Sequence, residues 1–399
     1  MDCNVLVFNC GSSSIKFQLL KVDTEQVLAK GSVERVGSID GTITFESAAG
    51  ETTANEPVPD HAAGMTLIRE AFKRGGFDLD NAGIVAIGHR VVHGGAAFSA
   101  PVLINDEALT AMRDVSVLAP LHNPANIIGI ERASAAFPKL PQVAVFDTAF
   151  FQNLPAAAST YAVDRQLASD NGIRRYGFHG TSHQYVSGRV PLMLNRDPSE
   201  LNQIVLHLGN GASVAAIRGG APVETSMGMT PLEGLVMGTR SGDIDAGVIF
   251  HLHRVAGMSV DQIDTALNRK SGMVGLSGVN DFRDLHALVA GGDHDAQLAL
   301  DVYIHRIKKY VGAYSAILGR LDAITFTAGI GENDSIVRSL ALAGLEGFGI
   351  VIDSERNNAK TRGARVISAD DSRVAVLVVP TNEELEIAQQ TLDVVKKRM

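Results

Sequence analysis

Short apolar runs and helical apolar stripes alternate along the chain, and their spacing predicts strands and helices in turn. Apolar runs at 4–8 and 15–20 flank a glycine–serine turn, which predicts a β-hairpin at the start of the sequence. A buried strand is expected at the start of 83–95. Further strands are expected at 27–36, 42–46, 142–146, 323–327 and 374–379, a second hairpin at 203–218, and helices at 60–74, 105–116, 123–136 and 382–397. This alternation predicts an α/β fold.

The turn of the first hairpin has an unusual composition. Gly11 allows close approach of a ligand, and the serines at 12–14 offer hydroxyl and N–H groups to phosphate oxygens, with Lys16 just beyond. A serine-rich surface turn would be the commoner explanation of this stretch alone. However, a similar strand–turn–strand pattern recurs at 203–220 when Ser14 is aligned with Ser213. Two such hairpins predict two related domains that close on one nucleotide, although neither fits the Walker or Rossmann pattern.

The length of 399 residues is more than one core usually supports. We expect an N-terminal α/β domain at 1–149, joined by a C-terminal helix at 385–399. A second α/β domain is expected at 150–384, with a helix-rich insertion at about 259–319. The boundary precedes a proline- and alanine-rich stretch at 155–158.

Composition narrows the functional classes. The net charge of −9 argues against a nucleic-acid partner. No apolar run approaches the roughly 18 to 20 residues that span a membrane, and no signal-like segment opens the chain, so a cytoplasmic protein is expected. The two cysteines, Cys3 and Cys10, suggest no disulfide framework.

Polar residues recur at strand ends and in glycine turns, where open α/β sheets place their sites. They are Asn9, Arg90, Asp147, His179, His207, Arg240 and Glu383. Arginine forks suit phosphate and carboxylate groups, and nearby Asn, Asp and Glu side chains suggest Mg²⁺. Zinc is the competing metal, from the spacings of His179 with His183 and His251 with His253, but no H-E-x-x-H or cysteine cluster supports it. A Ser-His-Asp hydrolase is also poorly supported, because the sequence contains no G-x-S-x-G elbow.

The last strand runs into Pro-Thr-Asn-Glu-Glu at 380–384. Thr381 with Glu384 fits a capping box, which would give Glu384 a structural role and leave Glu383 for chemistry.

Motifs spread over nearly the whole chain carry a specific resemblance. They lie at 7–16, 88–95, 146–150, 176–183, 207–214, 238–243, 281–283, 329–333 and 380–384. Together these segments look like the signature motifs of the acetate and propionate kinase family. The resemblance implies an actin-like, sugar-kinase-like (ribonuclease H-like) fold, in which two related α/β domains close over a nucleotide cleft. It also implies a homodimer.

The resemblance also implies roles for individual residues. Asn9 and Glu383 would be the magnesium-site residues, Arg90 the ligand of the substrate carboxylate or phosphate, and Asp147 the catalytic acidic residue, while His179 and Arg240 would stabilise the transition state. The nucleotide would contact Lys16, His207, Leu208, Gly209, Asn210, Gly211, Asp281, Phe282, Arg283, Gly329, Ile330, Gly331, Glu332 and Asn333. Acetate is already ionised at pH 7, so Asp147 is expected to orient an arginine or the metal shell rather than to remove a proton.

The implied activity is reversible, in-line phosphoryl transfer from ATP to acetate, giving acetyl phosphate and ADP, with Mg²⁺ as the metal and Mn²⁺ as its substitute. Val92, Leu121, Phe178 and Pro231, with His122 beside them, are hypothesised to form the pocket for the substrate methyl group. A propionate or short-chain acyl kinase is the alternative within the class. A chaperone-type ATPase of the same superfamily is the alternative outside it, and the cluster of Arg90 and His179 argues against that choice.

Overall fold

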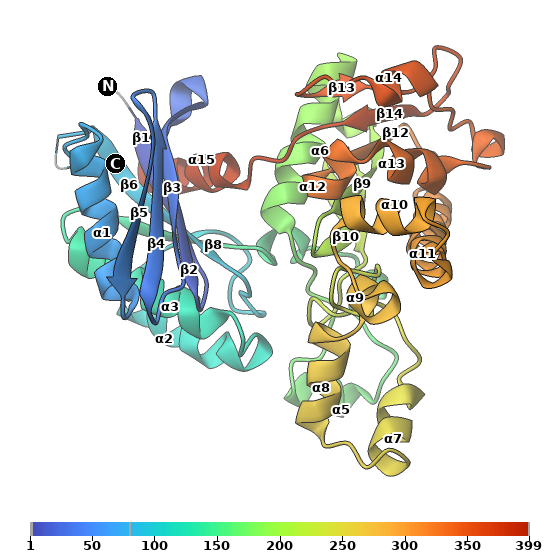
Figure 1. The fold of residues 1–399 in the computed structure, drawn as a ribbon, viewed down its shortest axis with the longest axis horizontal. Helices are drawn as coiled ribbons and strands as arrows, with labels where there is room; N and C mark the ends of the chain where they lie inside the picture. Colours follow the sequence, from blue (N-terminus) through green and yellow to red (C-terminus); the bar gives the residue numbers. More distant parts are fainter. Residues whose placement is uncertain (1–2, 80, 398–399) are drawn as a thin grey trace. The chain divides into compact units, whose positions relative to one another are not determined.

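The computed structural model describes residues 3–79 and 81–397, which fall into two compact units (Figure 1). One unit contains the chain up to Gln152 and from Asn382 onward, and the other is Asn153–Thr381. Compact units need not fold independently, as domains do. The domain limits predicted at 149 and 384 therefore stay predictions. The last two residues of the helix expected at 385–399 lie outside the described residues.

The first unit is built on an eight-stranded sheet in the order β5-β4-β3-β2-β1-β6-β8-β7. The predicted N-terminal hairpin is confirmed, because β1 pairs antiparallel with β2 and parallel with β6. Its elements are β1 (Asn4–Cys10), β2 (Ser14–Lys21), β3 (Gln26–Glu34), β4 (Ser38–Ser47), β5 (Gly50–Val58), α1 (His61–Arg74), β6 (Ile84–Val91), β7 (Val102–Leu103), α2 (Asp106–Asp114), α3 (Asn123–Ala136), β8 (Gln142–Phe146) and α15 (Glu383–Lys396).

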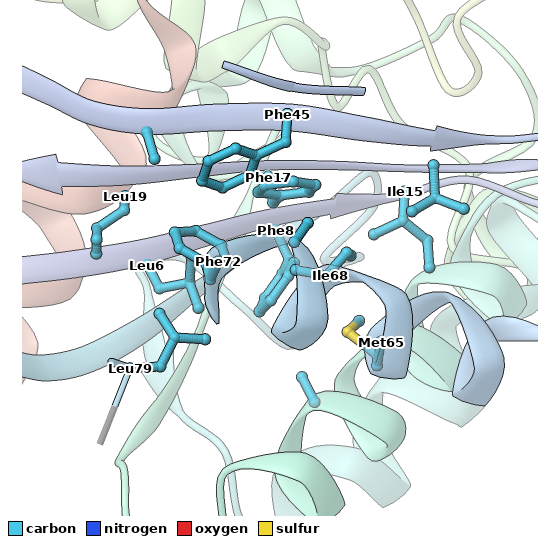
Figure 2. Packing of buried hydrophobic residues seen from close by; sticks show 14 of the residues in the cluster. Leu6, Phe8, Ile15, Phe17, Leu19, Phe45, Met65, Ile68, Phe72 and Leu79 are labelled. Atoms are coloured by element: carbon cyan, nitrogen blue, oxygen red, sulfur yellow. The ribbon is translucent and has the colours of Figure 1, made fainter. Parts of the chain in front are cut away.

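Alternate residues of the central strands face opposite layers. Leu6 and Phe8 of β1 pack with α1 and α3 in a core that also holds Phe17 and Phe72 (Figure 2). The opposite face of the same sheet carries α15. Gly88 of β6 faces that helix so closely that a Cβ there would clash with the side chains of α15. The odd-numbered positions of β1 therefore face α15, together with the even-numbered positions of β6.

The second unit has a six-stranded sheet in the order β11-β10-β9-β12-β14-β13. Its middle repeats the first sheet, because β9 pairs antiparallel with β10 and parallel with β12, as β1 does with β2 and β6. The strands are β9 (Asn202–Leu208), β10 (Ala212–Arg218), β11 (Ala221–Thr225), β12 (Ala323–Thr327), β13 (Arg365–Val366) and β14 (Ala375–Val378). The prediction of two related α/β halves is thus confirmed at the level of strand order.

Helices make up most of the remainder of the second unit. They are α4 (Ala156–Ser159), α5 (Arg165–Asp170), α6 (Gly180–Leu194), α7 (Gly247–Arg254), α8 (Val260–Arg269), α9 (Gly272–Ser277), α10 (Phe282–Ala290), α11 (His294–Leu318), α12 (Ala328–Asn333), α13 (Ser335–Leu342) and α14 (Ser354–Asn358). Within the described ranges, no helix is both long and apolar enough to cross a membrane. The cytoplasmic location stays a prediction.

The capping box predicted at the start of α15 is wrong. The N-cap is Asn382, whose Oδ1 accepts a hydrogen bond from the backbone N–H of Leu385 at 3.1 Å. Thr381 lies one residue too early, and its hydroxyl is hydrogen-bonded to the hydroxyl of Ser182 at 2.8 Å. Glu384 therefore has no capping partner in Thr381, and its carboxylate lies on the wall of a small cavity that Lys16 also lines.

Candidate active site

The strand ends of the first unit bring three of the predicted residues to one face. In the parallel register Phe8 lies beside His89, and Arg90 lies beside Val145, so Asn9, Arg90 and Asp147 project from neighbouring strand ends toward the layer of α15. Glu383 is the first residue of that helix. These polar side chains thus lie together at the carboxyl ends of neighbouring strands, as predicted from the sequence.

Arg90 and Asp147 form a bidentate ion pair. Nε of Arg90 donates to Oδ1 and Oδ2 of Asp147 at 3.0 and 3.2 Å, and Nη2 donates to Oδ2 at 2.6 Å. A second carboxylate, that of Glu383, lies 3.9 Å from Nη2. Burial lowers the pKa of Arg90, but the charges of Asp147 and Glu383 raise it more, and the net shift is upward. Burial raises the pKa of Asp147, and the guanidinium opposes that shift.

The neighbouring cavity, of about 220 Å³, is lined by Lys16 and Glu384 among others. Burial raises the pKa of Glu384, the adjacent Glu383 raises it further, and Arg90 and Lys16 lower it. Sequence reasoning missed Glu384 as a site residue because the capping pattern gave it a different role. The sequence signal for Glu384 was its position next to Glu383.

Val92, one of the residues predicted to contact the acid, follows directly after β6. The backbone N–H of Val92 donates to Oδ1 of Asn126 at 3.1 Å, and Nδ2 of Asn126 donates to the carbonyl of Cys10 at 2.6 Å. Asn126, on α3, thus ties the ends of β1 and β6 together. Val92 is partly buried, and Leu121 is half-exposed just before α3. Sequence reasoning missed Asn126, because a lone buried asparagine in a helix carries no local signal.

The second unit contributes a compact histidine cluster. His179 precedes α6 in a left-handed conformation with φ of 56°, and its Nδ1 is hydrogen-bonded to the hydroxyl of Ser213 at 2.9 Å. Nε2 of His183 is hydrogen-bonded to the same hydroxyl at 2.8 Å. The ring of His207 stacks on that of His179 with centroids 4.2 Å apart, and its Nδ1 is hydrogen-bonded to Ser182 at 2.7 Å. A strained non-glycine backbone at such a place is typical of functional sites.

Arg240 differs from Arg90 in the groups that surround its guanidinium. Its Nη1 donates to the carbonyl of Pro231 at 3.2 Å and approaches the sulfur of Met237 at 3.8 Å. No carboxylate in the described part of the chain forms an ion pair with it. Burial lowers its pKa. A partly desolvated guanidinium of this kind is suited to bind an anion.

These nitrogen atoms converge on the turn of the second hairpin. A Cβ built on Gly211 would lie 3.4 Å from Nε2 of His179 and 3.8 Å from Nη1 of Arg240. One built on Gly209 would lie 4.0 Å from Nε2 of His207. Glycine leaves this space open, so an anionic group that follows the backbone of the turn would meet all three side chains.

Beside this turn lies a cavity of about 620 Å³, a volume typical of ligand sites. It is lined by predicted nucleotide-binding residues, namely Gly209, Asn210, Asp281, Phe282, Arg283, Gly329, Ile330 and Asn333. Other predicted residues lie outside its lining, namely His207, Leu208, Gly211, Gly331 and Glu332. Sequence reasoning missed Gly238, Asn280, His286, Asp334, Ser335 and Ile336, which complete the wall. His286 Nε2 and Asp334 Oδ2 lie 2.7 Å apart.

Local backbone geometry explains the shape of this cavity. Ala328, at the start of α12, has φ of 65°, so β12 turns sharply into the helix that follows it. Gly238 leaves room for the amide of Asn210, with which any Cβ would clash. Phe178 is fully buried in the second unit, and Pro231 is partly buried on the loop that Arg240 contacts.

Within the described ranges, no three His, Cys, Asp or Glu side chains gather so that they could hold a metal by themselves. The spacing of His179 and His183 suggested zinc, but both rings are hydrogen-bonded to the hydroxyl of Ser213. His251 and His253 are exposed on α7.

Comparisons with known proteins agree with this arrangement. The sequence matches the acetokinase family over residues 4–389. It is 55% identical over 391 residues to acetate kinase of Streptomyces avermitilis, covering 97% of this chain and 96% of that one. The crystal structure of Porphyromonas gingivalis acetate kinase matches with a TM-score of 0.92 and 42% identity, over 98% of this chain and 100% of that one. A propionate kinase from Francisella tularensis matches with a TM-score of 0.92 and 41% identity, over 98% and 99%. The chain belongs to the acetokinase family.

Proposed function

We propose that this protein is an acetate kinase, which transfers the γ-phosphoryl group of ATP to acetate and gives acetyl phosphate and ADP reversibly. The observation that carries the assignment is the Arg240 guanidinium beside Gly211, which forms no ion pair with the described carboxylates and lies next to a nucleotide-sized cavity. Phosphoryl transfer needs positioned cations around the equatorial oxygens more than it needs acid–base groups. Membership of the acetokinase family supports the same chemistry.

Arg90 would bind the carboxylate of acetate or the phosphate of acetyl phosphate. Asp147 accepts hydrogen bonds from Nε and Nη2 of this guanidinium, and none of the three uses Nη1. Asp147 thereby fixes the plane of the fork while the two N–H groups of Nη1 face a substrate. Because acetate is ionised at neutral pH, Asp147 acts as an orienting group and not as a base.

The family implies a magnesium ion, and the donor set of the first unit fits it. Asn9 lies at the same strand-end level as Arg90, and Glu383 lies 3.9 Å from that arginine. Mg²⁺ takes one or two carboxylates and keeps several waters, so it does not need a cluster of three acidic side chains. Asn9 and Glu383 would hold the ion, with Mn²⁺ as a substitute. The ion would neutralise phosphate charge during transfer.

The nucleotide would lie in the 620 Å³ cavity, with its phosphates along the turn at 209–211. Neighbouring predicted residues, namely His207, Leu208, Gly331 and Glu332, would support the turn and α12 from outside the lining. His179 and Arg240 would donate hydrogen bonds to the transferring group. Lys16 would contribute a further cationic contact to the phosphates.

An acetyl-hydroxamate assay tests the proposal directly. The purified protein with ATP and Mg²⁺ should form hydroxamate only when acetate is present, and hydrolysis of ATP without acetate should be slow. Equal ATP consumption with and without acetate would favour a clamp-type ATPase and overturn the assignment. Propionate should be assayed in parallel, because the acetate and propionate kinases match this fold with the same TM-score.

The homodimer expected from the family has a candidate surface on α7. Val248, Ile249 and Phe250 are 38%, 38% and 57% exposed along this short helix. Burial of such adjacent apolar side chains against a second copy would remove them from water. Sedimentation should show a dimer, and Phe250→Glu should shift it toward monomer. A wild-type protein that sediments as a monomer would contradict the proposal.

A further inference from the structure

The hydroxyl of Ser213 lies between two histidine rings. It is 2.9 Å from Nδ1 of His179 and 2.8 Å from Nε2 of His183. Ser213 lies on β10 and is fully buried, as is His183 on α6. Ser213 aligns with Ser14 of the first hairpin, and the proposed function assigns roles to neither Ser213 nor His183.

The number of hydrogens limits the arrangements that this bridge allows. A hydroxyl carries one hydrogen, so it cannot donate to both ring nitrogens at once, and at least one ring must donate to the oxygen. In the first arrangement, Nε2–H of His183 donates to Ser213, and Ser213 donates to Nδ1 of His179. In the second, Nδ1–H of His179 donates to Ser213, and Ser213 donates to Nε2 of His183.

The two arrangements differ in what they leave on Nε2 of a neutral His179. In the first, Nδ1 accepts, so the only ring hydrogen lies on Nε2. In the second, Nδ1 carries that hydrogen, and Nε2 has one only when the ring is protonated. Exchange of the two requires a change of tautomer in both rings as well as rotation of the hydroxyl. Burial and the nearby ring of His207 lower the pKa of His183 well below its usual value, so His183 stays neutral and can fill either role.

The direction of Nε2 gives this hydrogen its significance. The atom faces Gly211, where a Cβ would lie only 3.4 Å away. The ring is held from its face by His207, with centroids 4.2 Å apart, and from its Nδ1 edge by Ser213. The Nε2 edge is therefore the one presented to the glycine turn.

We propose that the bridge takes the first arrangement, so that Ser213, which accepts a hydrogen bond from His183, is a positioning residue that orients the ring of His179 and keeps a hydrogen on its Nε2, directed at the phosphoryl group during transfer. The inference rests on the proposed function. It names a hydrogen bond that is donated and involves no transfer of the proton itself, so the reaction's atoms and charges are unaltered.

Ser213→Ala tests the proposal, with Ser226→Ala as the matched control. Ser226 is also fully buried, and its hydroxyl accepts a hydrogen bond from the backbone of Val214, next to Ser213. Both variants lose one buried hydroxyl, but only the first loses a histidine partner. We expect Ser213→Ala to lower kcat roughly 10- to 100-fold, by analogy with the loss caused by removing the hydrogen-bond partner of a metal-binding histidine. The KM for ATP should change less than about twofold, and Ser226→Ala should keep its kcat.

A double-mutant cycle separates positioning from general damage. In a His179→Ala background, Ser213→Ala should cause no further loss of kcat, because it acts through the missing ring. An equal loss in both backgrounds, or a loss matched by Ser226→Ala, would overturn the proposal. If Ser213→Ala does not fold, Ser213→Cys replaces it, since a thiol of similar size is a weak hydrogen-bonding group. Absence of acetate-dependent activity in the wild type would instead refute the proposed function.

Discussion

The two arginines of the candidate site differ in their counter-charges. Arg90, in the first unit, forms a bidentate pair with Asp147 and has Glu383 at 3.9 Å. Arg240, in the second unit, contacts a carbonyl oxygen and a sulfur. The same side chain is thus held as one half of a neutralised pair in one unit and as a desolvated cation in the other.

This difference in counter-charge indicates which arginine can orient a substrate and which can stabilise a transition state. A guanidinium whose charge is already balanced gains little from charge that develops during reaction, but its fixed fork can orient a carboxylate. A guanidinium without a carboxylate gains most when negative charge appears beside it, and that gain lowers the barrier if the charge belongs to the transition state. We therefore propose substrate orientation for Arg90 and transition-state stabilisation for Arg240.

The largest expected effect is that of Arg240→Ala on turnover. Loss of a cationic finger in phosphoryl transfer costs about 10³ to 10⁵ in rate, so kcat should fall by that order while the KM for ATP changes little. Arg240→Lys, which keeps the charge without the fork, should recover part of the loss. Steady-state kinetics on the folded variants provide the measurement. A near-normal kcat with a raised KM for ATP would mean that Arg240 only binds the nucleotide.

Arg90→Met should differ from Arg240→Ala in its effect on stability. Removal of Arg90 leaves the buried carboxylate of Asp147 without its partner, which costs about 3 to 5 kcal/mol of unfolding free energy. The double variant Arg90→Met with Asp147→Asn should recover much of that loss, because the uncompensated charge at position 147 is removed as well. Urea unfolding of the single and double variants checks this. Comparable destabilisation by Arg240→Ala would erase the proposed difference between the two sites.

Sequence reasoning found the strand-end residues because each follows an apolar run directly. Asn9, Arg90 and Asp147 needed only the rule that neighbouring parallel strands end at one edge, and the register confirms this placement. The pairing of Arg90 with Asp147, by contrast, joins residues 57 positions apart. The sequence therefore left open which arginine Asp147 orients, and the fold shows that it is Arg90.

Two other features were beyond local patterns for the same reason. Thr381 and Asn382 are both good N-cap residues, and Asn382 takes the cap while the hydroxyl of Thr381 is bonded to Ser182, a contact across 199 positions. His286 and Asp334 also line the candidate nucleotide cavity. Neither residue lies in one of the glycine turns from which the nucleotide site was predicted. Tertiary contacts decided both outcomes.

The comparison implies a pH effect in the first unit. If burial there requires a counter-charge, a buried base without one must stay neutral. His89 is such a base, since its Nε2 is hydrogen-bonded to the amide oxygen of Gln142 at 2.6 Å, and burial lowers its pKa from 6.5 to about 4. A histidine with a lowered folded pKa supports stability above its unfolded pKa and loses that support as pH falls from 6.5 toward 4.

Between pH 7.5 and pH 5, this linkage should cost about 2 kcal/mol, from about 1.4 kcal/mol per pH unit below 6.5. His89→Asn removes the titrating group, so the variant should lose less stability than the wild type over the same interval. Urea unfolding of both proteins at both pH values gives the difference. Parallel losses in the two proteins would show that His89 is already able to accept a proton in the fold.

The smallest expected effect concerns the acid that Arg90 orients. If Arg90 holds the carboxylate in a fixed plane, the substrate methyl group must point in a fixed direction, and Val92, two residues further along the same chain segment, is the proposed wall. The backbone of Val92 is pinned by Asn126, so trimming the side chain should enlarge the pocket without moving the wall. One methylene in an apolar pocket is worth about 1 to 3 kcal/mol, or roughly 10- to 200-fold, and Val92→Ala should therefore raise propionate kcat/KM relative to acetate about 10-fold, the lower end of that range. Leu121→Ala is the control, because Leu121 is 50% exposed and its loss should shift the ratio less. An unchanged ratio in Val92→Ala would mean that Arg90 fixes the carboxylate while other residues choose the acid.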